Sequence, residues 1–280
     1  MAALFKNPGP RNSSDDPEEF RATLVEHLEE LRTRIIRIVW MLIFGWVAGW
    51  YLFQPWASKE IDGMIARSVW PILDAKHIHH EIVWHTATEA FMFKLKFTFM
   101  LGFIAVFPLT LLQVWGFVSP ALKPNEKRPF KVLVPCSVLL FLLGAGFAWW
   151  VTPNALQWFT SYIEDFPGTA LFQEAGTLTF FVLKMLLAFG LAFQLPIIVY
   201  ALGAIGLLQS GTLLKYWRQS TVVIFIISAV LTPSNDAFTM LMMALPMCVL
   251  FMISVYLVRF TQRKKKRREE DEKREDDAED

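Results

Sequence analysis

Long apolar segments restrict this chain more than any other feature of its sequence. The six segments almost free of charge are residues 35–53, 91–112, 132–151, 178–205, 220–232 and 239–258. An α-helix needs about 20 mainly apolar residues to cross a hydrocarbon core of about 30 Å. Hydrophobic residues make up 54% of the 280 residues, a share too high for a soluble domain once the charged C-terminal residues are set aside. We therefore predict an all-α integral membrane protein with six transmembrane helices.

The last two spans are predicted to be short. At a rise of about 1.5 Å per residue, the apolar run at 221–231 covers only about 17–20 Å even with its flanks. A span this short either thins the bilayer or ends within it. We expect three parts along the chain: a polar N-terminal extension (1–15), a six-span membrane domain (16–260) and a charged, disordered tail (261–280).

The Lys and Arg residues concentrate on one side of the predicted membrane domain, and the 54–89 loop of the other side is mixed, with three bases among five acids. The basic segments of one side are 32–37, 123–131, 215–218 and 259–268, whereas residues 152–177 on the other side contain no Lys or Arg. Short basic loops remain in the cytoplasm, so both termini are predicted to be cytoplasmic. The basic block near the C-terminus suits anionic lipid headgroups. We expect the lipid bilayer as its partner and no nucleic acid.

A histidine cluster at His77–His85 in the first extracytoplasmic loop raises the question of a metal site. The motif H-E-x-x-H puts two histidines on one helix face, but His80 and His85 are five residues apart, about 140° off that face. Structural or incidental histidines are the favoured interpretation, then adventitious metal binding, then a catalytic metal. We predict no metal, cofactor or catalytic residue. Cys136 and Cys248 lie in apolar runs without C-x-x-C spacing, which indicates free buried thiols.

Span four contains two polar side chains. A charge at the bilayer centre costs about 2.5–3.5 kcal/mol, which makes Lys184 a functional candidate, although its ammonium is close enough to the extracytoplasmic end to reach water. Gln194 lies deeper and is expected to bond either within the bundle or to a partner helix. Prolines bend the spans, either as ordinary kinks or to form a concave wall. They are Pro108, Pro135, Pro196, Pro233 and Pro246.

Two carboxylates stand among the bases of the cytoplasmic side. Glu30 lies near the end of an amphipathic segment, and Glu126 belongs to the loop between spans two and three. The bias of bases toward the cytoplasm does not explain these acids. They are either solvated helix-face charges or a pair that binds a ligand with two guanidinium groups, each held by two hydrogen bonds.

Several short motifs occur together along the chain. They are H-L-E-E-L-R-T-R (27–34), E-A-F (89–91), Q-V-W-G-F-V-S-P-A-L (113–122), E-K-R (126–128), F-G (189–190), F-Q-L-P (193–196), L-T-P (231–233) and A-L-P (244–246). With these motifs in this order, the chain resembles the TatC family, the polytopic subunit of the twin-arginine protein translocase, over about residues 20–258.

The resemblance implies a receptor and assembly core, not an enzyme, that binds the twin-arginine signal peptides of folded proteins. It implies TatA- and TatB-like single-span partners, association with further copies, and export across the bacterial inner membrane driven by the proton-motive force. The proline-bent helices would form a concave, glove-like face. The residues implied for signal-peptide binding are Glu30, Glu126, Arg32, Phe117 and Pro120.

Other polar positions of the family bear on partner contacts. Those matched or substituted in this chain are Glu89, Lys184, Gln194, Asp236 and Met240. Gln194 stands where many members have a buried Glu, Met240 where Gln is frequent, and Met252 where Glu is frequent. These departures concern the docking of partner helices and leave signal-peptide recognition untouched. Lys184 would supply a replacement polar contact.

A small-solute secondary transporter is the alternative function. It would predict inverted repeats, paired broken helices and ionisable groups at the membrane midplane. The sequence contains no internal repeat, and its midplane is nearly without charge. No G-x-x-x-x-G-K-[ST] motif occurs either, which agrees with a process driven by the proton-motive force instead of a nucleotide.

Overall fold

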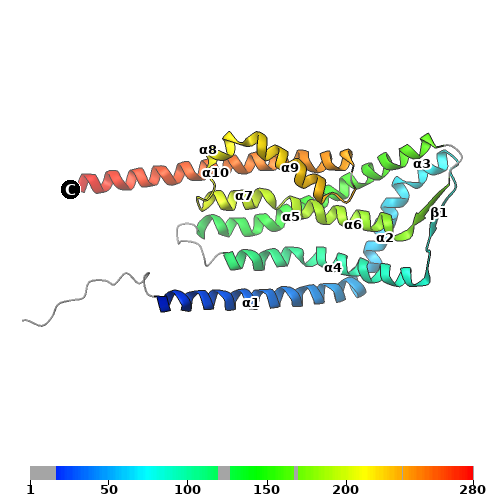
Figure 1. Ribbon diagram of the computed structural model, residues 1–280, viewed down its shortest axis with the longest axis horizontal. Helices are drawn as coiled ribbons and strands as arrows, with labels where there is room; N and C mark the ends of the chain where they lie inside the picture. The colour runs from blue at the N-terminus through cyan, green and yellow to red at the C-terminus, as the bar shows by residue number, and fades with distance from the viewer. Residues whose placement is uncertain (1–16, 119–126, 167–169, 235, 280) are drawn as a thin grey trace, which may run out of the picture.

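The computed structural model describes residues 17–118, 127–166, 170–234 and 236–279. Its helices lie side by side along one long axis (Figure 1). The principal helices are α1 (Pro17–Ala48), α4 (Ala87–Val118), α5 (Lys127–Ser161), α6 (Ala175–Ala192), α7 (Leu195–Ala204), α9 (Trp217–Leu231) and α10 (Ala237–Glu279). Five described helical segments are long and apolar enough to cross a membrane, and α9 is a shorter apolar helix. The predicted all-α membrane fold is confirmed, with one small sheet added.

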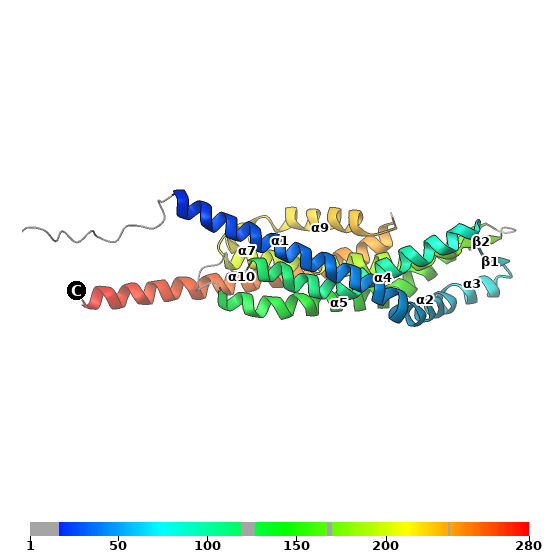
Figure 2. The same ribbon diagram turned by 90° about the horizontal axis from the view of Figure 1, so that it is seen from below.

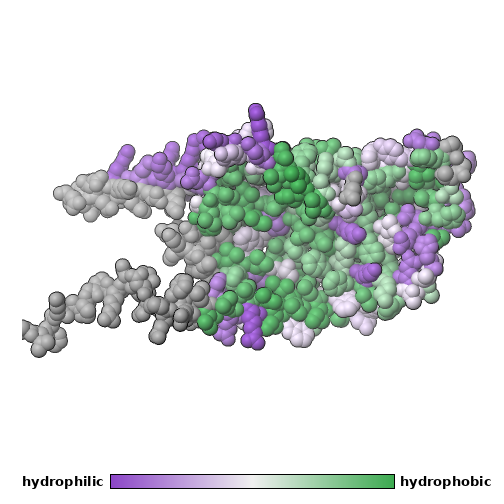
Figure 3. Space-filling view, in the orientation of Figure 1, coloured by the Kyte–Doolittle hydropathy of each residue, from purple (hydrophilic) through white to green (hydrophobic). Residues whose placement is uncertain are grey.

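The two ends of the bundle are distinguished by where the basic residues lie. One end, called the basic end below, holds the start of α1, the end of α4, the start of α9 and the charged end of α10 (Figures 1 and 2). Apolar residues cover the middle of the face in Figure 3, while hydrophilic residues gather along the charged part of α10 and at the opposite end. An apolar middle between hydrophilic ends matches a bundle surrounded by lipid.

Helix α1 is the least buried of the long helices and packs mainly against α4. It continues through a π-helical turn, η1 (Gly49–Phe53), into α2 (Gln54–Ser68) and the short α3 (Trp70–Ala75). The backbones of α1 and α4 approach closely because Gly45 faces Gly102. A Cβ atom on Gly102 would overlap the carbonyl oxygen of Gly45. Small residues allow this close contact in a membrane, where apolar helices gain little from leaving lipid.

The main core lies between α5, α6, α9 and α10. Met185 and Phe189 of α6 meet Met243 of α10 there, and all three side chains are fully buried. Helix α6 ends just before Gln194, and α7 begins just after it. Pro196 sits in the first turn of α7, where its missing N–H removes no helical hydrogen bond. Span four is therefore two helices with a break between them.

Span five is short, as predicted, and the apolar part of span six continues into a long charged helical extension. Helix α9 has 15 residues, which corresponds to about 22 Å. Helix α10 has 43 residues and continues through the tail to Glu279, so the prediction of a disordered tail is wrong for the described residues. Glu, Lys and Arg are good helix formers, and opposite charges four residues apart add support, as between Lys266 and Glu270 at 3.8 Å. The side chain of Gln262 fixes the start of this extension, because its Nε2 donates to the carbonyl oxygens of Gly203 and Leu208 at 3.0 and 2.8 Å.

A two-stranded parallel sheet closes the end opposite the basic end. Strand β1 (His80–Val83) pairs with β2 (Leu171–Glu174), with His80 opposite Leu171. A 3-10 turn, η3 (Tyr162–Asp165), precedes β2. Each strand has only four residues, too few for an alternating pattern to stand out in the sequence. The sheet links the two loops of this end, over a core that contains Leu73, Phe97, Leu156 and Leu183.

Candidate functional site

Glu30 of α1 lies at the basic end and is engaged in an ion pair. Arg34, one turn further along α1, donates from Nη2 and from Nε to Oε1 of Glu30, at 2.6 and 3.0 Å. Nδ1 of His27 lies 3.9 Å from the other carboxylate oxygen. The side chains of Glu30 and Arg34 are 32% and 20% exposed, so solvent reaches the carboxylate more readily than the guanidinium.

The end of α4 forms the other wall of this site. The imidazole ring of His27 stacks on the ring of Phe117, with centroids 4.4 Å apart and planes 15° from parallel. Nη1 of Arg34 donates to the carbonyl oxygen of Gln113 at 3.4 Å. A Cβ atom on Gly116 would overlap Nη1 of Arg34, so the absence of a side chain there makes room for the guanidinium. We call His27, Glu30, Arg34, Gln113, Gly116 and Phe117 the Glu30 site.

The Glu30 site contains an acceptor without a donor. Oε1 of Gln113 is buried and accepts no hydrogen bond from the described residues. A buried polar atom without a partner carries a free-energy cost. Together, a partly exposed carboxylate and a half-buried pair of aromatic rings beside it are suited to a ligand that carries N–H donors.

The five residues implied for signal-peptide binding are only partly brought together. Glu30 and Phe117 belong to the same site, and Arg32 is an exposed residue of α1 beside it. Glu126 and Pro120 lie outside the described residues. Helix α5 begins at Lys127, the residue after Glu126, and its first turns lie at the basic end (Figure 1).

Two other family-matched acids begin helices at the opposite end. Oδ1 of Asp236 accepts the N–H of Thr239 at 2.8 Å, and its Oδ2 accepts the Thr239 hydroxyl at 2.6 Å, so Asp236 caps α10. Glu89 lies in the first turn of α4, and its Oε2 accepts the N–H groups of His85 and Thr86, the residues just before the helix, at 2.7 and 3.4 Å. This is the reaching-back half of a capping box. The His85 N–H lowers the pKa of Glu89 most, and a side-chain hydrogen bond with Glu174 lowers it further.

The polar residues of span four differ in their surroundings. Gln194 is buried, and its Nε2 donates to the carbonyl oxygen of Ser137 on α5 at 3.1 Å. Of the two roles that the sequence left open, the structure thus contains the bond within the bundle. Oε1 of Gln194 is buried without a donor among the described residues. Lys184 is exposed on α6, as a side chain that reaches toward water would be.

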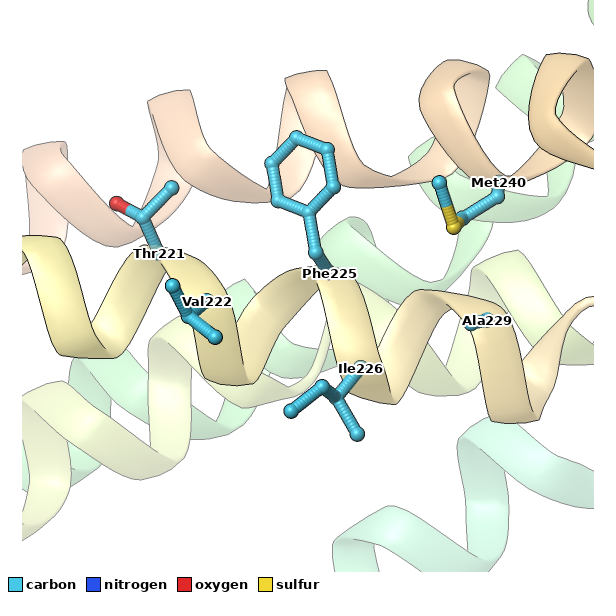
Figure 4. Close-up of a pocket in the computed structure, with 6 residues that line it drawn as sticks. All are labelled: Thr221, Val222, Phe225, Ile226, Ala229 and Met240. Carbon is cyan, nitrogen blue, oxygen red and sulfur yellow. The ribbon is translucent and has the colours of Figure 1, made fainter.

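An apolar groove of about 410 Å³ runs along α9 near the start of α10. The residues that line it are Thr221, Val222, Phe225, Ile226, Ala229 and Met240. Figure 4 shows Phe225 pointing from α9 toward α10, and Met240 on α10 beyond it. The hydroxyl of Thr221 donates to the carbonyl oxygen of Trp217 on its own helix, which leaves the groove lined almost entirely by apolar atoms. Met252 lies elsewhere, partly buried against the main core.

The histidine loop has local partners. His80 stacks on Trp70 with ring centroids 4.9 Å apart, and its Nε2 lies 3.8 Å from Oδ1 of Asp74. Within the described ranges, no three His, Cys, Asp or Glu side chains come together as a metal site would require. Both cysteines are free, but each is only partly buried, whereas the sequence predicts full burial.

Sequence reasoning missed two residues that shape the Glu30 site. Arg34 is one of several bases in its segment, and only its spacing of four residues from Glu30 signals an ion pair. Gly116 belongs to a quoted motif, but nothing in the sequence says which side chain fills the space it leaves.

Comparison with known proteins decides the family. The family model described as Sec-independent protein translocase protein (TatC) matches residues 26–246. The chain belongs to the TatC family. A TatC-named protein of Xylanimonas cellulosilytica is 34% identical over 82% of this chain and 81% of its own length. Another, of Aquifex aeolicus, is 34% identical over 86% of this chain and 96% of its own length.

Solved structures agree with this TatC assignment. A crystal structure of the twin-arginine translocase receptor TatC is 32% identical, with a TM-score of 0.65, and the match covers 84% of this chain and 99% of that one. A second, in DDM, gives a TM-score of 0.63. As a TatC-family protein, the chain is a polytopic membrane component of a protein translocase that works with other Tat subunits, and it is not an enzyme.

Proposed function

We propose that this TatC-family protein recognises twin-arginine signal peptides at the Glu30 site, together with Glu126. The observation that carries the proposal is the geometry of the Glu30 carboxylate, which holds a guanidinium through two hydrogen bonds, from Nη2 and Nε of Arg34. Arginine forms such two-pronged contacts because its guanidinium is planar and carries several donors, whereas a lysine ammonium acts as a point charge. A carboxylate placed in this way discriminates the two residues.

The surroundings of Glu30 support the same ligand. The stacked rings of His27 and Phe117 offer an apolar surface beside the charge. Glu126 contributes the second carboxylate, since it directly precedes α5, which begins at the basic end. Two acids from separate segments suit two consecutive arginines.

The basic end faces the cytoplasm in this proposal, and both termini lie there, in the bacterial inner membrane. The distribution of Lys and Arg over the short segments supports this orientation. Folded cargo proteins would then be recognised before export, which the proton-motive force drives.

Single-span TatA- and TatB-like partners dock on the α9–α10 groove in this proposal. Val222 and Ile226 of α9 are 59% and 58% exposed, so they offer apolar surface to a neighbouring helix. With Met240 in place of a polar residue, docking here depends on the packing of apolar side chains. Such packing is a main source of helix association in membranes.

Site-specific photo-cross-linking tests signal-peptide recognition directly. A photo-reactive residue replaces Phe117 or Glu126 in membranes that contain the whole protein, and a twin-arginine peptide is compared with a twin-lysine peptide. We expect cross-links to the first peptide only. The matched control position is Trp84, an exposed aromatic residue at the opposite end, which should cross-link neither. Equal labelling of both peptides, or of neither, would contradict recognition at this site.

A further inference from the structure

The carboxylate proposed to receive a peptide arginine is already occupied by an arginine of the chain itself. Arg34 donates to Oε1 of Glu30 from Nη2 at 2.6 Å and from Nε at 3.0 Å. Both donors share one carboxylate oxygen, and an incoming guanidinium could present the same pair of donors to it. A ligand arginine therefore meets a carboxylate that is paired, not free.

Arg34 is also held from the side of α4. Its Nη1 donates to the carbonyl oxygen of Gln113 at 3.4 Å, and its guanidinium lies in the space left by Gly116. Only 20% of the Arg34 side chain is exposed. Surface ion pairs on helices are usually mobile and weak, but this one is positioned by contacts with a second helix.

We propose that Arg34 is a resident substitute for a signal-peptide arginine and sets the affinity threshold of the receptor. This inference rests on the proposed function of Glu30. On binding, one peptide guanidinium replaces the Arg34 guanidinium on Glu30, and Arg34 moves away from the gap beside Gly116. The Arg34–Glu30 pair is exchanged for a pair between the peptide arginine and Glu30. The net gain in binding free energy is therefore only the difference between these two pairs.

The exchange makes a quantitative prediction about selectivity. Every ligand that uses Glu30 must displace Arg34, so each loses the same increment of binding free energy. Arg34 then lowers the affinity for twin-arginine and twin-lysine peptides by the same factor and leaves their ratio unchanged. Arg34 thereby raises the dissociation constant of the weaker twin-lysine peptide above the concentration at which that peptide is present.

Two variants release Glu30 by different means. Arg34→Gln removes the guanidinium and its charge. Gly116→Ala keeps every charge but places a methyl group where Nη1 of Arg34 lies, and the flexible end of Arg34 can move aside. Alanine is also the better helix former, so this variant is expected to fold. Arg37→Gln is the matched control, because it removes one positive charge from an exposed residue of the same helix.

The measurement is peptide binding to the purified full-length protein in nanodiscs, by fluorescence anisotropy with labelled twin-arginine and twin-lysine signal peptides. We expect Arg34→Gln and Gly116→Ala to bind both peptides roughly fivefold more tightly, as expected for losing a competing pair worth about 1 kcal/mol. The ratio between the peptides should stay constant, and Arg37→Gln should change affinity by less than twofold. Thermal unfolding of each variant verifies that it is folded.

The outcomes separate this inference from the function on which it rests. Glu30→Gln should lose twin-arginine binding, and wild-type affinity in that variant would overturn the proposed function itself. If Glu30→Gln loses binding but Arg34→Gln and Gly116→Ala bind no more tightly than the wild type, recognition by Glu30 stands and the substitution by Arg34 is refuted. A gain in Arg34→Gln that Arg37→Gln reproduces, without a gain in Gly116→Ala, would also refute it, because net charge would then explain the effect.

Discussion

The Glu30 site and the α9–α10 groove use opposite physical means on one small bundle. The Glu30 site contains an ion pair with distances of 2.6 and 3.0 Å, a stacked ring pair and a buried acceptor without a donor. The groove is lined by apolar side chains, and the one hydroxyl there is satisfied within its own helix. Charged partners can be exchanged cheaply where water is near, whereas an unpaired polar group within lipid is costly. Charged contacts are therefore placed near water and apolar contacts within the lipid, where the desolvation cost of each is lowest.

The largest effect is expected when a carboxylate proposed for signal-peptide binding is removed, because this should stop peptide recognition and leave the α9–α10 groove unaffected. Glu126→Ala should abolish export of a twin-arginine reporter, because one peptide guanidinium loses its carboxylate, a contact worth about 1.5–3 kcal/mol. The variant should still insert and co-purify with single-span partners at the wild-type yield. Reporter activity and partner yield are measured on the same membranes, with Glu29→Ala as a control that removes an exposed acid next to Glu30 to which no binding role is assigned. Normal export by Glu126→Ala would remove its recognition role, and a loss of partners would mean that the regions are not independent.

The converse change fills the groove. Ala229→Trp places a large ring where a partner helix would pack, and we expect the yield of co-purified partners to fall about tenfold, as for overpacking that costs 1–3 kcal/mol. Peptide cross-linking at Phe117 should be unchanged. Val230→Trp is the matched control, since Val230 is the next residue on α9, is 78% exposed and does not line the groove. An equal loss in both variants would place the partner elsewhere on α9.

The sequence predicts the helices well because each helix is determined by the composition of its own segment. A run of apolar residues must form a helix in lipid, so the six spans follow from composition alone. The spans were predicted without the break at Gln194, although Pro196 signals it, and without the helical tail beyond Phe260. Hydrophilic composition suggested disorder there, but the same Glu, Lys and Arg residues are strong helix formers once α10 provides a start.

The Glu30 site was predictable only in part, because its geometry depends on a contact between helices far apart in the sequence. The motif containing Glu30 and the motif containing Phe117 point to one surface through the family resemblance. The pairing of Arg34 with Glu30 and the room provided by Gly116 depend on how closely α1 approaches α4. That distance is set at Gly45 and Gly102, two glycines that local patterns do not connect.

A smaller effect tests whether the acid near the groove acts through its charge or through its hydrogen bonds. Asp236 accepts the N–H and hydroxyl of Thr239 at the start of α10, the helix that carries Met240. Asp236→Ala should lower the free energy of unfolding by about 1 kcal/mol, because the cap is lost. Asp236→Asn should retain most of the stability, since Asn caps helices as well as Asp does. Thermal unfolding in detergent measures both variants, and equal losses would show that the negative charge matters more than the cap.

The smallest effect concerns Glu89, which caps α4 at the far end from the Glu30 site. The His85 N–H lowers the pKa of Glu89 below its ordinary value of 4.5, so its stabilising contribution is present above that pH and is lost as the pH falls through the folded-state value. The unfolding temperatures of the wild type and Glu89→Gln should therefore differ by a constant amount from about pH 7.5 to about pH 5.5 and converge only in stronger acid. Convergence already near pH 6 would contradict the assignment of the titrating group to the Glu89 carboxylate.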